Sequence, residues 1–205
     1  MRQMSRPRQT NLREFGVIKD QMLKQRVAEA LGVRVEDLTV DLLLQLDGLD
    51  ASELGITTVA GLERCCNLTI LSLQDNRISD ISPLMTLKYL EVLSLNGNPI
   101  SDLSPVRALT ELRDLYFGQT EVADISFVSA LPNLELISFP LSRVTSLVDL
   151  YFSHFITKAT PRLKKVYAHN NDLGLGSNAF VAALQQAGLE VWSGGCPKQG
   201  ITPRG

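Results

Sequence analysis

Apolar residues recur along the chain with a period of 22 residues between Leu46 and Leu150. When Leu68 is counted as position one, leucine or isoleucine also stands at positions four, six, eleven, fourteen, seventeen and twenty. Nearly all of these positions are also apolar in the units that begin at Leu46, Leu90, Leu112 and Leu134. A fixed period of this length predicts stacked turns, each with a short strand and an outer segment.

Asparagine also repeats within the units, and this repetition assigns it to the scaffold. Asn76, Asn98 and Asn171 hold the same position of their units. A side-chain amide at this position is expected to be buried and to bond to backbone groups of neighbouring turns, because buried polar groups need partners. We therefore interpret the three residues as a structural asparagine ladder.

The polar stretch after the predicted strand has two possible interpretations. Asp80 is followed by Ser82-Pro83, and serine at an N-cap with proline in the first turn predicts a short helix. A calcium-binding loop that starts at Asp75 is the alternative. That loop lacks glycine at its sixth position and has Thr86 where a glutamate ligand is required. The helix start is therefore the preferred interpretation.

The repeated units follow the pattern L-x-x-L-x-L-x-x-N, and two of them end in ISDISPL or ISDLSPV. This pattern resembles the leucine-rich repeat family and is most similar to the bacterial internalins. It is also similar to the short-repeat class of phosphatase regulators and dynein light chains. The resemblance covers about Leu46 to Leu173 and implies an α/β fold. The expected fold is a right-handed leucine-rich repeat solenoid with a parallel β-sheet on its concave face, 3₁₀ or other short helices on its convex face, and a helical N-terminal cap.

Both ends of a stacked array need caps, because the terminal units would otherwise expose their cores. On the N-terminal side we predict a short helix from Thr39 to Leu46, preceded by a longer one over 17–31 that ends at Gly32. The apolar positions of the longer helix are Ile18, Met22, Val27, Ala30 and Leu31.

The C-terminal side departs from the period. The unit after Leu134 begins at Leu163, 29 residues later, and we expect the seven extra residues to form a longer convex helix and a loop near 151–160. Ser177 is predicted to cap a final helix that Gly188 ends, followed by an edge strand over 189–192. The chain then divides into a disordered basic tail (1–16), the helical N-terminal cap (17–46), the solenoid (47–175), a C-terminal capping helix and strand (176–193) and a second tail (194–205).

Composition narrows the possible partners. The formal net charge is −2, so no electrostatic argument favours nucleic acid or an anionic membrane. No apolar run reaches the ~18 residues of a membrane span, and nothing near Met1 resembles a secretory signal. The three cysteines cannot form a disulfide framework. We therefore expect a cytoplasmic protein.

Motifs that could carry chemistry have simpler structural explanations. Gly174, Gly176 and Ala179 form a nominal dinucleotide fingerprint, but the acidic residue expected about twenty positions later is absent. Cys65 occupies a core position of its unit, and no zinc-ligand spacing is present. We predict no catalytic residue, no metal and no cofactor.

The predicted binding site follows from the alternation of side chains along each strand. The concave face is expected to bind another protein, with its centre at Tyr116, Leu136, Tyr167 and His169 and with both tyrosines outside the core. The site residues predicted for this face are Ile70, Ser72, Gln74, Val92, Ser94, Asn96, Asp114, Tyr116, Leu136, Ser138, Lys165, Tyr167 and His169.

The sequence therefore predicts a monomeric, non-enzymatic module that binds a partner protein. Three alternatives remain open at this stage: a regulatory or adaptor subunit of an enzyme such as a phosphatase, a component of a cytoskeletal motor, and a bacterial effector.

Overall fold

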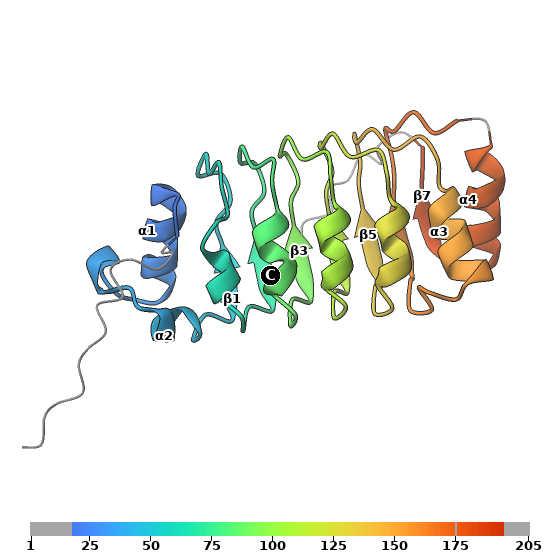
Figure 1. Cartoon of the computed structure of the whole chain (residues 1–205). Helices are drawn as coiled ribbons and strands as arrows, with labels where there is room; N and C mark the ends of the chain where they lie inside the picture. The colour runs from blue at the N-terminus through green and yellow to red at the C-terminus, as the bar shows by residue number, and fades with distance from the viewer. Residues whose placement is uncertain (1–17, 175, 195–205) are drawn as a thin grey trace, which may run out of the picture.

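The computed structural model describes residues 18–174 and 176–194 and has one parallel sheet in which strands follow one another in chain order. The sheet lies behind the helical segments in Figure 1. This arrangement confirms the predicted leucine-rich repeat solenoid. Its seven strands are β1 (Gly48–Asp50), β2 (Ile70–Ser72), β3 (Val92–Ser94), β4 (Asp114–Tyr116), β5 (Leu136–Ser138), β6 (Lys165–Tyr167) and β7 (Glu190–Trp192).

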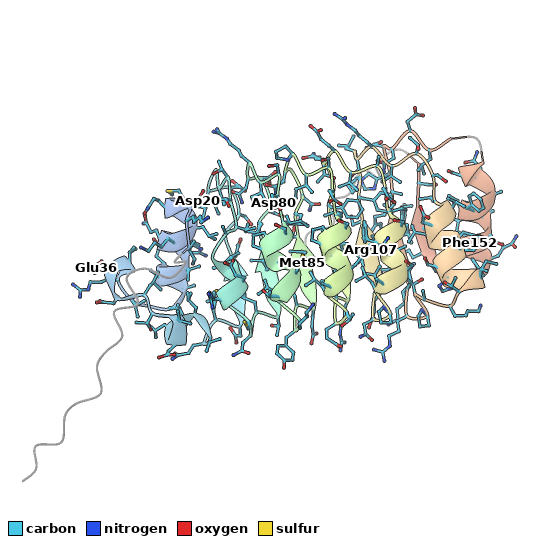
Figure 2. The ribbon with its side chains drawn as sticks, viewed as in Figure 1. Asp20, Glu36, Asp80, Met85, Arg107 and Phe152 are labelled. Carbon is cyan, nitrogen blue, oxygen red and sulfur yellow. The ribbon has the colours of Figure 1, made fainter. Side chains whose placement is uncertain are left out.

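Helical segments make the N-terminal cap and the side opposite the sheet. In the cap they are α1 (Gln21–Ala30), the 3₁₀ helix η2 (Val35–Asp37) and α2 (Val40–Leu43). In the array they are the 3₁₀ helices η3 (Leu62–Arg64), η4 (Ser82–Thr86), η5 (Ser104–Ala108) and η6 (Ser126–Ala130), followed by α3 (Val148–Tyr151), the π-helix η7 (Phe152–Ile156) and α4 (Ser177–Gln186). Figure 2 shows Met85 and Phe152 on this helical side, where both are exposed.

Strand register explains the 22-residue period. Leu71 pairs with Leu93, and Leu93 pairs with Leu115, so equivalent residues of successive units lie side by side. All three side chains are buried, together with the other repeated apolar positions of the units. Burial of large apolar side chains stabilises the fold by about 1.5–3 kcal/mol each, so the repeated core dominates the stability of the array.

The asparagine ladder is present. The amide oxygen of Asn76 accepts from Ile56 N at 2.9 Å, and its nitrogen donates to Ala51 O and Leu73 O at 2.8 Å each. The amide of Asn98 repeats this arrangement one unit later. Asn171 accepts from the backbone N–H of Ser142 and donates to the carbonyls of Phe139 and Ala168. Each amide therefore joins neighbouring turns.

An aspartate bonds to the first residue of η4, η5 and η6, and the predicted serine N-cap is wrong. Asp80 accepts a hydrogen bond from the backbone N–H of Ser82 at 2.8 Å, and Asp102 and Asp124 make the same bond in the next two units. The serine is the first helical residue, so its own hydroxyl cannot cap the turn. The bonded amide stabilises the ionised carboxylate and lowers the pKa of Asp80.

The N-terminal helix is shorter than predicted and buries a different face. Asp20 caps α1 by accepting from the backbone N–H groups of Met22 and Leu23, so the helix begins at Gln21. Its buried residues are Leu23, Val27 and Ala28, whereas Met22 is 46% exposed and Ala30 also lies in solvent. Residue 17, where the predicted helix began, lies outside the described residues.

Ile18 lies before α1 and reaches the first turn of the array. Lys19 N donates to Ala60 O at 3.0 Å. A Cβ atom at Gly61 would lie 2.4 Å from the Cα atom of Ile18. Gly61 also has a φ of +109°, so this close approach needs glycine for two reasons.

The predicted convex insertion is helical. Successive segments α3 and η7 accommodate the extra residues, and the hydrogen bond from Thr157 N to Phe152 O closes a π turn. Tyr151 packs against Phe180 of α4 with ring centroids 5.1 Å apart. The insertion is therefore anchored to the C-terminal cap.

One detail of that cap differs from the prediction. Ser177 is the first residue of α4, after Gly176, and its hydroxyl donates to Thr145 O at 3.5 Å instead of capping the helix. Gly188 ends the helix with a φ of +88°, as its position after the last helical turn predicted.

Candidate functional site on the sheet

The outward side chains of the seven strands form regular rows, and we call this surface the sheet face. It corresponds to the concave face predicted from the repeats. The middle residue of every strand is buried, so the first and third residues point to the opposite side. The first residues form the row Gly48, Ile70, Val92, Asp114, Leu136, Lys165 and Glu190, and the third residues form the row Asp50, Ser72, Ser94, Tyr116, Ser138, Tyr167 and Trp192.

Most of the predicted site residues are accessible on this face or just beyond it. Ile70 is 53% exposed, and Lys165 is also exposed. The partly exposed ones are Ser72, Gln74, Val92, Ser94, Asn96, Asp114, Tyr116, Leu136, Ser138 and His169.

The prediction that Tyr167 lies outside the core is wrong. Its side chain is only 8% exposed, because β7 adds a strand beyond it and places Trp192 opposite. The Tyr167 hydroxyl donates to Glu190 Oε1 at 3.0 Å, and burial followed by this carboxylate raises the pKa of Tyr167 to about 12. Tyr167 therefore holds the sheet together at its C-terminal end and is not an open anchor for a partner.

Two accessible residues at this end, Trp192 and Glu190, were missing from the predicted site. Trp192 is 42% exposed, and its indole N–H donates to Glu190 Oε1 at 3.0 Å. Lys165 Nζ lies 3.4 Å from Glu190 Oε2. The edge strand itself was predicted, and alternation along it could have placed both residues on the sheet face.

Polar side chains at the N-terminal end bond to one another. Ser52 Oγ donates to Asp50 Oδ1 at 2.6 Å and lies 2.8 Å from Ser72 Oγ. Ser94 Oγ lies 3.5 Å from Gln74 Oε1. These internal bonds order the polar side chains around the middle of the face.

The middle of the sheet face is more apolar. We call Ile70, Val92, Asp114, Tyr116 and Leu136 the central patch. Ile70 and Val92 are neighbours in register, and Asp114 stands between Val92 and Leu136. Burial, followed by the nearby Glu135 carboxylate, raises the pKa of Asp114. Apolar side chains and one aromatic ring on a strand face open to solvent are typical of a contact surface.

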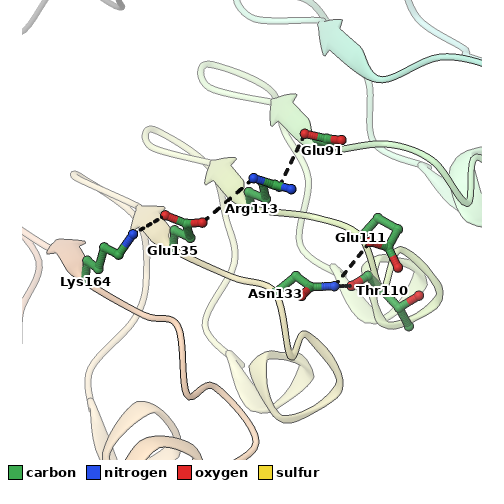
Figure 3. Close-up of polar contacts among 7 residues, drawn as sticks. All are labelled: Glu91, Thr110, Glu111, Arg113, Asn133, Glu135 and Lys164. Carbon is green, nitrogen blue, oxygen red and sulfur yellow. Dashed lines mark hydrogen bonds and ion pairs between the residues drawn. The ribbon is translucent and has the colours of Figure 1, made fainter.

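A row of ion pairs that was not predicted from the sequence runs along the edge where the strands begin. Figure 3 shows Glu91, Arg113, Glu135 and Lys164 on successive turns. The nitrogen–oxygen distances are 3.3 Å for Arg113–Glu91, 4.0 Å for Arg113–Glu135 and 2.6 Å for Lys164–Glu135. Each residue directly precedes a strand, so the alternating charges at this single position could have revealed the row.

The cysteine geometry argues against nucleophilic chemistry at Cys65. This residue is fully buried, and burial followed by the neighbouring Cys66 raises the pKa of its thiol to about 12. Such a thiol is almost entirely protonated at neutral pH. Cys66 is partly exposed and donates to Glu63 O at 3.4 Å.

Within residues 18–174 and 176–194, no group of three or more His, Cys, Asp or Glu side chains is arranged to hold a metal ion. Over the same residues, every helix is too short or too polar to cross a lipid bilayer.

Comparisons with known proteins agree with this geometry. A family model described as leucine-rich repeats, two copies, matches residues 66–108. An internalin (InlF) structure from Listeria monocytogenes is 22% identical, with a TM-score of 0.69, over 87% of this chain and 56% of that one. Internalin C2 from the same organism is 28% identical, with a TM-score of 0.57, over 76% of each chain.

A leucine-rich repeat protein from Leptospira interrogans is also similar in structure. It is 18% identical, with a TM-score of 0.60, over 74% of this chain and 38% of that one. The chain thus spans about half of InlF and less of the Leptospira protein. The search of curated protein sequences gave no match. These likenesses establish the fold and leave the partner open.

Proposed function

Because the chain is an internalin-like leucine-rich repeat protein, we propose that it binds a partner protein through its sheet face. Leucine-rich repeat domains are in general protein–protein interaction modules. The observation that carries this proposal is the central patch, which presents accessible apolar side chains and a tyrosine beside a polar, internally bonded end of the same sheet.

The size of the face is sufficient for a specific interface. Neighbouring strands lie about 4.8 Å apart, so seven strands span roughly 29 Å. A standard interface buries about 800 Å² on each partner. A partner of ordinary size can therefore cover the central patch and the polar side chains around it.

The covered ends of the array support a monomeric binder. On the N-terminal side, Arg26 of α1 donates to Asp50 O at 2.6 Å and holds the cap against β1. On the C-terminal side, Gln185 Nε2 donates to Val191 O at 3.1 Å and occupies a carbonyl of the last strand. Filled backbone acceptors on an edge strand oppose pairing with another copy.

Cys65 and Cys66 are free thiols within residues 18–174 and 176–194, which favours a reducing compartment, and a cytoplasmic location is therefore part of the proposal.

The test is affinity purification with the tagged chain, followed by identification of the bound proteins by mass spectrometry. The same experiment is run with Ile70→Glu/Leu136→Ser on the sheet face and with Phe152→Glu on the helical side. Phe152 is as exposed as Ile70, at 53%, so it is a matched control. Circular dichroism shows whether each variant is folded.

We expect the wild type and Phe152→Glu to recover the same partner. The sheet-face variant should lose it, because removal of interface anchors costs about 2 kcal/mol or more, roughly thirtyfold in affinity. Loss of the partner in Phe152→Glu alone would place the site on α3 and η7 instead.

A further inference from the structure

Asp114 stands out in the central patch because it is a carboxylate in an apolar setting. Its neighbours in the same row are Val92 on β3 and Leu136 on β5. Tyr116 follows two residues later on β4, so both side chains leave the same side of the sheet. Asp114 and Tyr116 are both half-buried.

The other two acidic residues of the strands already have partners in the chain. Asp50 accepts from Ser52, and Glu190 accepts from Tyr167 and Trp192 and pairs with Lys165. Within residues 18–174 and 176–194, the Asp114 carboxylate makes neither a hydrogen bond nor an ion pair.

The nearby cations Arg113 and Lys165 pair with other carboxylates. Arg113 points along the strand-start edge and pairs with Glu91 and Glu135. Lys165 lies two strands from Asp114 in register and pairs with Glu190. Because neighbouring strands lie about 4.8 Å apart, the backbones of β4 and β6 are about 9.6 Å apart.

A half-buried carboxylate without a partner is unfavourable, and an opposite charge beside it would form a favourable ion pair. Burial disfavours the ionised form, and it raises the pKa of Asp114. When a partner covers the apolar neighbours, the local dielectric falls further and an ion pair there strengthens. A single carboxylate is too few ligands for a metal ion, and it repels phosphate groups.

We propose that Asp114 selects the partner by pairing with one lysine or arginine side chain that is flanked by apolar residues. This inference rests on the proposed function of the sheet face. The cation of the partner lies beside Tyr116, whose ring attracts positive charge. The flanking apolar residues pack on Val92 and Leu136. The ligand is therefore a protein segment in which a basic residue stands among apolar ones.

The test uses a phage-displayed library of random peptides, selected on the immobilised wild-type chain. Selected peptides are synthesised, and their affinities are measured by isothermal titration calorimetry. The variants are Asp114→Asn, which keeps the shape, and Asp47→Asn, which removes the same charge from an exposed position before β1. Ile70→Glu reports whether a peptide binds the sheet face at all.

Expected peptides carry lysine or arginine between apolar residues. Asp114→Asn should weaken them by about tenfold or more, because a buried charged hydrogen bond is lost, whereas Asp47→Asn should change affinity less than twofold. Asp114→Lys should reject these peptides and accept the versions in which glutamate replaces the basic residue. This charge exchange distinguishes direct pairing from a general loss of structure.

Two outcomes would overturn the inference. If peptides lose affinity in Ile70→Glu but lack a basic residue or bind Asp114→Asn equally well, the role of Asp114 is refuted and the sheet face is retained. If no peptide is selected, both proposals are refuted: that the sheet face binds a partner and that Asp114 selects it. The same holds if the affinity of the selected peptides is unchanged in both Ile70→Glu and Asp114→Asn.

Discussion

The N-terminal and central turns of the array hold neighbouring units together in different ways. In the turns around Asn76 and Asn98, a buried amide joins backbone groups of adjacent units. In the next two units, Thr120 and Ser142 take the same position and offer only hydroxyl groups. The repeated position therefore keeps its place in the fold while its chemistry changes.

The backbone adapts locally where the amide is missing. Ile78 N donates to Asn98 Oδ1 of the following unit at 3.0 Å. Its equivalent one unit later, Ile100 N, donates instead to the carbonyl of Asn98 in its own turn at 2.8 Å. Thr120 likewise bonds within its own turn, to Phe117 O at 2.7 Å.

Fewer polar links join these units, although Ser142 Oγ still donates to Phe117 O of the preceding unit at 3.0 Å. Aromatic packing adds to these links. Phe117 and Phe139 are fully buried and stack with ring centroids 5.1 Å apart. Phe127 of η6 contacts Phe117 edge-on at 6.0 Å. Equivalent positions in the two preceding units hold Leu73 and Leu95. In this fold, therefore, stacked rings accompany a reduced polar ladder.

The largest expected effect comes from removing the ring stack. Phe117→Ala should lower the free energy of unfolding by about 3–5 kcal/mol, because it deletes a buried ring and leaves a cavity between two units. Urea denaturation followed by circular dichroism measures the loss. Phe117→Leu should cost less, since leucine occupies this position in the preceding unit.

A double variant sharpens the comparison. Phe117→Leu/Thr120→Asn converts the unit to the N-terminal type and should recover part of the stability that Phe117→Leu loses. A double variant that is less stable than Phe117→Leu would show that the two kinds of link are not interchangeable in this fold.

The next effect concerns the ladder itself. Asn98→Ala should cost about 1–3 kcal/mol, because the backbone N–H of Ile78 and two carbonyls lose a buried partner. Asn98→Asp should also destabilise, since it places a charge at a site that is 1% exposed. Thr120→Ala is the matched control and should cost less, because the Thr120 hydroxyl serves only its own turn and one neighbouring hydroxyl. Equal denaturation midpoints for Asn98→Ala and the wild type would contradict the ladder.

A smaller effect is expected at the C-terminal end, where Tyr167 is buried by β7. Tyr167→Phe should cost about 1 kcal/mol at neutral pH, through loss of the hydrogen bond to Glu190. The pKa of Tyr167 is raised to about 12 from an ordinary 10, so the folded state favours the protonated form. This stabilisation is complete below pH 10 and is lost as pH rises towards 12.

Urea midpoints at pH 8 and pH 11 check this prediction. The wild type should lose more stability between these two conditions than Tyr167→Phe, because the variant has no phenol to ionise. Parallel losses in the two proteins would show that Tyr167 titrates normally and that its burial contributes little.

Sequence reasoning recovered the features that the repeat itself determines. The period placed Leu71, Leu93 and Leu115 in one buried row, and the repeated asparagines identified the ladder. Both features depend on equivalent residues of successive units lying next to each other, and a fixed sequence period predicts this arrangement directly. The burial of Tyr167 depends on Trp192 and Glu190, which follow a spacing of 25 residues and lie outside the regular period.

The errors at the N-terminal cap have a similar origin. Asp20 fixes where α1 begins, and its second carboxylate oxygen accepts from Thr57 N at 3.0 Å, which ties the start of the helix to the array. Apolar spacing alone allowed two faces, one with Met22 and one with Leu23. A single capping side chain decided between them, and no repeat copies it elsewhere in the chain.

The smallest expected effect concerns the ion-pair row, which crosses from the ladder units into the aromatic units. Arg113→Gln removes the central cation between Glu91 and Glu135 and should cost a few tenths of a kcal/mol up to about 1 kcal/mol, because all three side chains are solvent-accessible. The loss should shrink at 1 M salt, where the screening length falls to about 3 Å. Arg143→Gln is the matched control, since it removes only one exposed pair, with Glu121 at 3.5 Å. Denaturation midpoints at low and high salt compare the two variants. A salt-independent loss in Arg113→Gln would mean that the arginine acts through packing of its stem, and that the charges along this edge do not link the two halves of the array.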